Sequence, residues 1–169
     1  MKKGLNLGSG YIIFQQESTF FFNVDIEPLP GVDIVHDLNI FPYPFEDESI
    51  DIILMYDVLE HLDNPIDVLQ ECWRILKKDG KVCLKVVYWN NYNTFSDPQH
   101  KHGFTEKYFD FFIGVRRKYY MKHHFLSKKI KHVFTPEATE RYGHNIKSLL
   151  KKAFFHCNII ESLDVTLTK

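Results

Sequence analysis

Lys3-Gly4-Leu5-Asn6-Leu7-Gly8-Ser9-Gly10 is the stretch of this sequence that decides the expected fold. Apolar residues run directly into Gly-Ser-Gly, which is how a buried parallel strand ends in a loop whose backbone can approach a ligand. Three later apolar runs, at 23–26, 36–38 and 52–57, also end in or contain an acidic residue. The carboxyl ends of parallel strands meet at one edge of a sheet, so the sequence predicts a ligand crevice at that edge.

The length and composition of the chain indicate a single domain over residues 1–169. Hydrophobic residues make up 44% of it, which is ordinary for a folded domain with its own core. No apolar run reaches the roughly 18 residues of a membrane span, and Met-Lys-Lys before the glycine loop leaves no room for a signal peptide. Cys72, Cys83 and Cys157 lack Cys-x-x-Cys spacing, so we expect buried free thiols and a cytoplasmic protein.

Charge is divided unevenly along the chain. Residues 1–110 hold 9 Lys and Arg against 18 Asp and Glu, whereas residues 111–169 hold 12 against 4. The basic residues concentrate in the segment 116–132. This segment either folds back on the acidic half or forms a solvated face, or else it contacts an anionic partner such as nucleic acid, a phosphorylated sugar or a membrane surface.

The first half of the chain predicts strands at 3–7, 20–24, 32–36 and 50–56. Only about a dozen residues separate Gly10 from the second strand, which is too few for a full crossover helix and strand entry. We therefore expect a short helical turn or an irregular loop over 11–18. Prolines at 42 and 44 predict a loop with aromatic anchors over 41–45.

The clearest helix begins after residue 63. Asp63 or Asn64 caps it, Pro65 is its first residue, and Gly80 is its expected end. Its apolar stripe comprises Ile66, Leu69, Trp73 and Leu76.

The remaining segments alternate between strands and helices. We expect a strand at 81–87, a polar aromatic loop at 88–104, a helix at 105–113, a strand at 125–134, a helix at 136–155 and a strand at 159–167. This order predicts an α/β fold with a Rossmann-like, doubly wound and mostly parallel sheet and a shortened first crossover.

The glycine loop disfavours two common cofactor classes. A nicotinamide site needs Gly-x-Gly-x-x-Gly opening a helix, but Ile13 occupies the third position and no long helix follows. A nucleoside triphosphate loop needs Gly-Lys-Ser/Thr, which is absent.

The motifs instead resemble those of the class I S-adenosylmethionine-dependent methyltransferases, and are most similar to the type 11 (small methyltransferase domain) group. The resemblance covers residues 3 to about 112, with 113–169 left as a substrate-side segment and the last strands. Its most specific parts are the runs 45–51, 56–62 (Tyr-Asp-Val-Leu-Glu-His-Leu) and 65–80. The family's first loop reads Asp/Glu-x-Gly-x-Gly-x-Gly, whereas this chain has Asn6 at the acidic position and Ile12 at the last glycine.

The resemblance implies S-adenosyl-L-methionine as cofactor. It places Asp25 on the ribose hydroxyls and Asp37-Leu38 beside the adenine, and a carboxylate at a strand end suits a diol. Asn6 can still hydrogen-bond near the methionine portion, with a somewhat weaker affinity than an acid would give. The predicted cofactor-binding residues are Asn6, Leu7, Gly8, Ser9, Gly10, Asp25, Ile26, Asp37, Leu38, Tyr56 and Asp57.

Methyl transfer requires mainly the placement of a nucleophile, and a base only where the acceptor must lose a proton. His61 is the candidate catalytic residue, as a base or an orienting group; alternatively it caps the next helix. His100 and His102 are either acid/base groups, metal ligands or part of a lid, and two histidines without a third ligand make a poor zinc site, so we expect no metal. Tyr88, Trp89 and Tyr92 either stack on an acceptor or cover the core.

Three functions are compatible with these features. The first is a methyltransferase acting on a small molecule or glycan. The second is an RNA methyltransferase that uses the basic segment 116–132, and the third is a non-catalytic relative that binds the cofactor. The sequence leaves the acceptor and the oligomeric state open.

Overall fold

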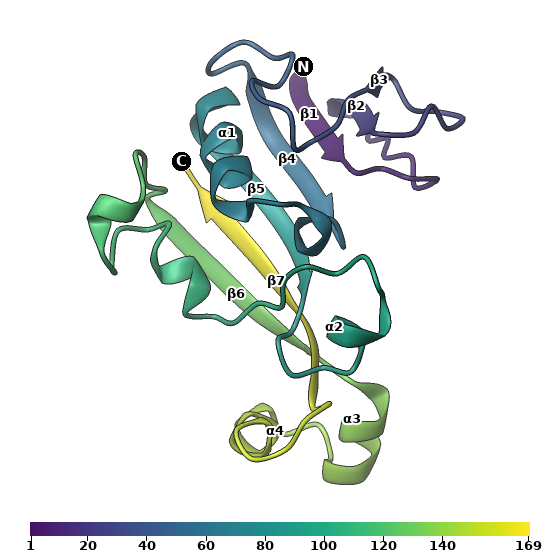
Figure 1. Cartoon of the computed structure of the whole chain (residues 1–169), viewed down its shortest axis with the longest axis vertical. Helices are drawn as coiled ribbons and strands as arrows, with labels where there is room; N and C mark the ends of the chain where they lie inside the picture. Colours follow the sequence, from purple (N-terminus) through teal and green to yellow (C-terminus); the bar gives the residue numbers. More distant parts are fainter.

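The computed structural model describes residues 1–169 and contains one seven-stranded sheet of order β3-β2-β1-β4-β5-β7-β6 (Figure 1). The first five strands are parallel, and β7 runs antiparallel to both β5 and β6. The predicted α/β fold with a mostly parallel sheet is therefore confirmed. The strands are β1 Lys2–Leu7, β2 Thr19–Asp25, β3 Ile34–Val35, β4 Ile50–Tyr56, β5 Leu76–Val87, β6 Ser127–Phe134 and β7 Ile160–Thr168.

Strands β1 to β4 follow one another without an intervening helix. The predicted irregular loop over 11–18 is confirmed, and it packs on the sheet in place of a helix. The ring of Phe14 meets that of Phe21 on β2 edge to face, with 4.9 Å between centroids. Ile13 fills the space beside Gly31, where a Cβ would lie 2.6 Å from its Cγ1. The shortened crossover thus still covers part of β2.

Helix α1 (Pro65–Ile75) lies across β4 and β5 (Figure 1). It begins as predicted, because the Asn64 side chain accepts hydrogen bonds from the N–H groups of Ile66 and Asp67. The expected end at Gly80 is wrong. Leu76 is extended and pairs with Ile50, while the N–H of Asp79 donates to the C-terminal Lys169 carbonyl. Pairing with distant strands thus replaces the last helical turn, and residues 76–80 become the start of β5.

The core joins this helix to the sheet and to an aromatic cluster from the segment 104–125. Phe104, Phe109, Phe112 and Phe125 are all fully buried there. The helix expected at 105–113 is reduced to one 3-10 turn, η2 (Tyr108–Asp110). Aromatic packing holds this segment, because the ring of Phe109 packs between those of Phe104 and Phe112.

The helix expected at 136–155 is two helices, α3 (Pro136–Tyr142) and α4 (Ile146–Ala153). The break falls at Gly143, whose φ of 76° ends α3, and the side chain of Asn145 caps α4 by accepting from the Ser148 N–H. Both helices lie beyond the end of β6 and the start of β7 (Figure 1). None of the helices has the length and apolar character that crossing a membrane requires.

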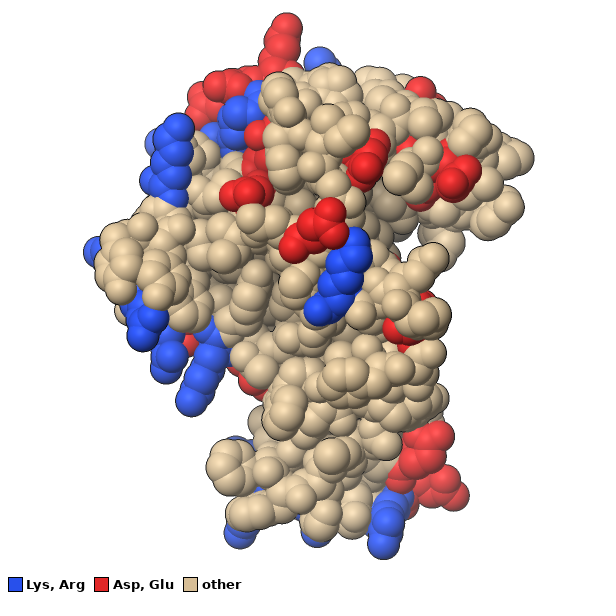
Figure 2. Space-filling model, in the orientation of Figure 1, with Lys and Arg blue, Asp and Glu red and all other residues tan.

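The basic segment folds partly onto acidic side chains. Arg116 and Lys128 pair with Asp110, and Lys131 lies 3.9 Å from Asp164. Arg117, Lys118, Lys122 and Lys129 make no ion pair. Figure 2 shows Lys and Arg side chains on the side of the molecule that carries β6, with Asp and Glu mostly over the half that holds β1 to β4.

The three cysteines are free thiols with different exposure. Cys72 on α1 is buried, whereas Cys83 is half-buried and Cys157 is exposed in the turn after α4. The expectation that all three are buried is wrong for Cys157, because its turn lies outside the core.

Candidate functional site

The carboxyl edge of the sheet brings together the residues predicted to bind a cofactor. β1, β2, β3 and β4 are neighbours, so the loop 8–10, Asp25, the segment 36–38 and Tyr56 follow adjacent strand ends. The N–H groups of Gly8 and Ser9 both donate to the Val24 carbonyl, at 2.8 and 3.0 Å. The glycine loop is thereby fixed against the end of β2.

Asp25 connects the ends of β1 and β2. Its Oδ2 accepts from the Gly10 N–H at 2.7 Å and its Oδ1 from the Glu27 N–H at 3.1 Å. An ionised carboxylate has about four acceptor positions. Each oxygen therefore keeps capacity for a further donor, such as a ribose hydroxyl.

The two glycines of the loop have different surroundings. A Cβ on Gly8 would lie 2.3 Å from Val58 Cγ2, whereas a Cβ on Gly10 would meet no atom within 4 Å. Gly8 is therefore needed for packing, and Gly10 borders open space. Between them, the hydroxyl of Ser9 is buried and has no hydrogen-bond partner.

Asn6 lies beneath the loop and is buried. Its Nδ2 donates to the Ile12 carbonyl at 2.8 Å and to Asn23 Oδ1 at 3.0 Å. A carboxylate has no N–H and could make neither bond. This explains the amide at a position where the family has an acid, and it shows Asn6 holding the loop.

The adenine-side residues differ in how far they face solvent. Leu38 is buried in the core, while Ile26 is 58% exposed. The carboxylate of Asp37 accepts from the N–H and the side-chain amide of Asn39, through Oδ1 in both cases. Ile26 and Asp37 therefore offer an apolar surface and an acceptor, with Leu38 beneath them.

These residues fit S-adenosylmethionine. The unpartnered Ser9 hydroxyl, the open space at Gly10 and the free acceptor capacity of Asp25 lie along one edge. Gly10 and Asp25 are half-buried and a Cβ on Gly10 would meet no atom within 4 Å, so this edge forms an open shelf.

A polar pocket of about 550 Å³ adjoins this shelf at the ends of β4 and β5 and the start of β7. Val87 is its one hydrophobic residue. Tyr56, at the end of β4, is 45% exposed, and Asp57 follows it with a φ of 55°. The charged and titratable residues of the pocket are Asp57, Glu60, Lys85, Asp97, His100 and Glu161.

Lys85 and Asp57 form an ion pair in this pocket, with 2.9 Å between Nζ and Oδ2. Burial opposes the charge of Lys85, but the ion pair with Asp57 outweighs it and raises the pKa of the ammonium group. Lys85 therefore holds the Asp57 side chain in this pocket.

Glu60 was missed by the sequence analysis. It is 1% exposed, its Oε1 accepts from the Val87 N–H at 3.3 Å, and its Oε2 is buried without a partner. Burial raises the pKa of this carboxyl to about 7. Its place inside the run 56–62 was the available signal, but nothing in the spacing distinguished it from a solvated acid.

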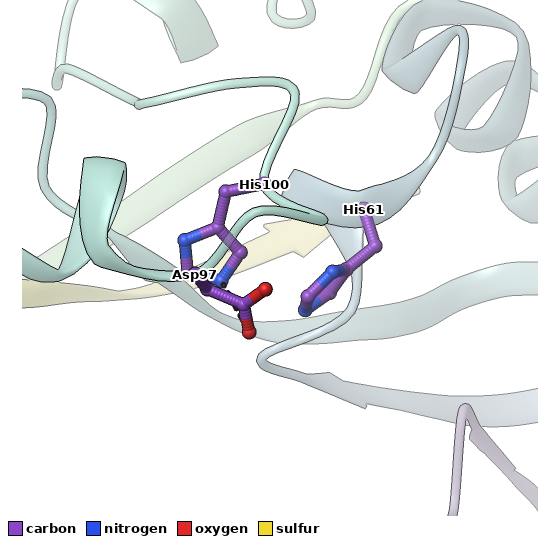
Figure 3. A group of neighbouring side chains, drawn as sticks. All are labelled: His61, Asp97 and His100. Atoms are coloured by element: carbon purple, nitrogen blue, oxygen red, sulfur yellow. Dashed lines mark ion pairs between the residues drawn. The ribbon is translucent and has the colours of Figure 1, made fainter.

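His61 belongs to the 3-10 turn η1 (Leu59–His61) and does not cap α1, which Asn64 does. Its ring packs against that of His100, with 4.7 Å between centroids (Figure 3). Burial and then the neighbouring His100 lower the pKa of His61. Both effects favour the neutral imidazole.

The side chains of His100 and His102 contact different parts of the molecule. His102 Nε2 lies 3.0 Å from the Leu62 carbonyl, whereas His100 joins His61. The aromatic residues before them also separate: Tyr88 is buried and covers the core, while Trp89 and Tyr92 are exposed.

The known proteins that resemble this chain and have a described activity are methyltransferases. Residues 22–84 match a model described as a methyltransferase domain. An uncharacterized protein of Methanocaldococcus jannaschii is 31% identical over 87 residues, covering 50% of this chain and 38% of that protein. A probable S-adenosylmethionine-dependent methyltransferase of Mycolicibacterium smegmatis is 37% identical over 51 residues, 30% of this chain and 20% of that one. The matches thus span well under half of these relatives.

Solved structures show the same fold over the whole chain. A SAM-dependent methyltransferase from Archaeoglobus fulgidus has a TM-score of 0.72 at 16% identity, covering 99% of this chain and 86% of that one. A SAM-dependent methyltransferase from Thermotoga maritima, described as a possible histamine N-methyltransferase, has a TM-score of 0.61 at 18% identity, covering 100% and 83%. The predicted family resemblance and fold class are therefore confirmed.

Proposed function

We propose that this chain, which shares the methyltransferase domain over residues 22–84 and the fold of S-adenosylmethionine-dependent methyltransferases, transfers a methyl group to a polar small molecule or a glycan. The observation that carries the proposal is the Asp25 carboxylate, which holds the Gly10 N–H at the junction of β1 and β2 and keeps free acceptor capacity.

S-adenosylmethionine would supply a methyl group already activated on a sulfonium. Asp25 would bind the ribose hydroxyls, and the loop 7–10 would lie along the cofactor with Asn6 fixing its shape. Ile26, Asp37 and Leu38 would border the adenine, while Tyr56 and Asp57 would border the methionine portion. The acidic character of this half of the chain suits a cationic sulfonium.

The acceptor would bind in the polar pocket beside the shelf. Its carboxylates and single Lys85 suit a ligand rich in hydroxyl or amino groups, and its one hydrophobic residue gives little surface for an aromatic ring. His61 lies beside this pocket with a lowered pKa, and it would accept the proton of a hydroxyl or ammonium acceptor.

Isothermal titration calorimetry with S-adenosylmethionine and S-adenosylhomocysteine tests the cofactor site. Asp25→Asn keeps an oxygen for the Gly10 N–H but removes the charge. Since a hydrogen bond to a charged group contributes about 1.5–3 kcal/mol, we expect affinity to fall roughly tenfold to hundredfold. Glu27→Gln is the matched control, because it removes a charge two residues away and should bind like the native chain. Equal affinity in Asp25→Asn and the native chain would contradict the site.

Transfer itself is tested with methyl-labelled cofactor and a panel of hydroxyl- and amine-bearing small molecules and glycans. Labelled product that falls in His61→Ala supports methyl transfer with His61 as base or orienting group. Cofactor binding without transfer to any acceptor would favour a non-catalytic relative of the fold.

A second candidate acceptor is RNA. Arg117, Lys118, Lys122 and Lys129 make no ion pair, and Tyr119 is exposed among them. Binding of single-stranded RNA that weakens steeply with salt, and that is lost when these four cations are neutralised, would favour this acceptor.

A further inference from the structure

Three potential metal ligands meet at the edge of the polar pocket, where His61 lies beside Asp97 and His100 of the pocket wall. One ligand atom from each of His61, Asp97 and His100 lies within 4.8 Å of the other two (Figure 3). His61 comes from the turn after β4, whereas Asp97 and His100 come from the loop after α2 (Asn93–Ser96). Figure 3 shows the Asp97 carboxylate between the two imidazole rings.

The orientation of His100 is fixed by its second nitrogen. Nδ1 lies 2.9 Å from the Asn93 carbonyl oxygen, which can only accept, so this nitrogen carries the proton. In the neutral ring Nε2 then presents a lone pair toward Asp97 Oδ2, 3.9 Å away. Histidines that bind a metal usually donate one ring N–H to a backbone carbonyl, a carboxylate or a water and bind the metal through the other ring nitrogen.

Asp97 is held in a similar way. Its Oδ1 accepts from the Gln99 N–H at 2.8 Å, which leaves Oδ2 toward His100. Two acceptors that face one another without a donor between them are stabilised by a cation placed there.

The surroundings also favour a cation. Asp57, Glu60, Asp97 and Glu161 line the pocket against the single cation Lys85, which is already paired. The Nδ1 of His61 and the Oε2 of Glu60 are both buried without a hydrogen-bond partner. Such unpartnered polar atoms are costly unless a water, an ion or a ligand satisfies them.

We propose that His61, Asp97 and His100 bind a divalent first-row transition metal ion of the zinc class, with an open coordination position facing the pocket. Imidazole nitrogens favour such ions over magnesium or calcium. Metal–ligand bonds of about 2.1 Å at tetrahedral angles place ligand atoms roughly 3.4 Å apart. The His100–Asp97 separation of 3.9 Å is close to this value, and Asp97, with 45% of its side chain exposed, is free to complete the approach.

This site goes beyond the proposed methyl transfer and replaces the expectation of no metal. A bound ion takes up the imidazole lone pair of His61, so the role of His61 as a base belongs to the metal-free chain. The sequence offered His100 and His102 as the only pair, but His102 is directed to the Leu62 carbonyl, and the missing ligands come from 39 residues upstream and from Asp97.

The test is a titration of the metal-free chain, stripped with a chelator, with Co²⁺ alone and no methyl donor. We expect visible d–d absorption that saturates at one ion per chain and is displaced by Zn²⁺. Asp97→Ala and His100→Ala should each weaken binding more than tenfold, whereas His102→Ala, in the same loop, should bind like the native chain.

Circular dichroism of each variant verifies its folding, and the exposed Asp97 gives the variant with least effect on the fold. No stoichiometric Co²⁺ band, or an unchanged band in Asp97→Ala and His100→Ala, would overturn the proposal. Because no methyl donor is present, either result is independent of the outcome of the calorimetry with S-adenosylmethionine.

Discussion

Replacing each glycine of the 8–10 loop by alanine separates packing from ligand binding. Both glycines have positive φ, 69° at Gly8 and 51° at Gly10, so each alanine costs about 1–2 kcal/mol of unfolding free energy. Only Gly8→Ala adds a collision, because its Cβ would lie 2.3 and 2.8 Å from the two methyl carbons of Val58.

Overpacking of this kind costs a further ~1–3 kcal/mol. We therefore expect Gly8→Ala to lose roughly 2–5 kcal/mol and Gly10→Ala only the backbone cost. For a chain of this length, 1 kcal/mol corresponds to about 2–4 °C in Tm. Thermal unfolding followed by circular dichroism should place the Tm of Gly8→Ala several degrees below that of Gly10→Ala.

Ligand binding should show the opposite order. The Cβ of Gly10→Ala points into the open space where we place the cofactor, so its affinity for S-adenosylhomocysteine should fall roughly tenfold to hundredfold by the same overpacking cost. Val58→Ala removes both colliding methyls, so it should cost less stability in Gly8→Ala than in Gly10→Ala, where it only removes packing against the core. Equal Tm losses for the two glycine variants, or an equal cost of Val58→Ala in both, would refute this reasoning.

Three further predictions concern single side chains. Asn6→Asp would turn two donated hydrogen bonds into repulsion between acceptors and should lower the unfolding free energy by about 2–4 kcal/mol, measured by urea denaturation, with Asn6→Ala losing less. Tyr43→Phe removes the hydroxyl that donates to the Leu38 carbonyl in the core, and should cost about 1–2 kcal/mol in the same assay; a neutral result would mean that water replaces the bond. Cys157 should react fast with a thiol reagent under native conditions, while Cys72 reacts only on unfolding, and equal rates would contradict the burial described.

Local signals in the sequence predicted the parts of the fold that depend on local interactions. Asn64 and Pro65 mark the start of α1 because capping is decided within four residues. Its end was wrong because residues 76–80 pair with β4 and with the C-terminus, which no local pattern reports. Gly143 was a local signal for the break in the helix expected at 136–155, because glycine readily adopts the positive φ that ends α3.

In the candidate site, too, the sequence indicated the residues whose position depends on strand order, but not those whose position depends on how a distant loop folds. The sequence could bring the proposed cofactor residues to one edge because they lie at or just after strand ends, and strand order in a parallel sheet brings those ends together. The cluster of His61, Asp97 and His100 could not, because it depends on how the loop after α2 folds over the end of β4. The buried state of Glu60 has the same origin, since that loop places the N–H of Lys101 on its backbone carbonyl.

A hydrogen-bonded chain takes the place of the missing helix after β1. Asp33 accepts from the backbone and side chain of Asn23, and Asn23 Oδ1 accepts from Asn6 and from the Phe14 N–H. This chain runs across β2 and fixes the loop without a helix N-terminus. A helix N-terminus attracts anions such as phosphate. S-adenosylmethionine carries no phosphate and bears a positive sulfonium, so a loop held by amides and directed to the Asp25 carboxylate loses only the attraction of a helix N-terminus for the methionine carboxylate.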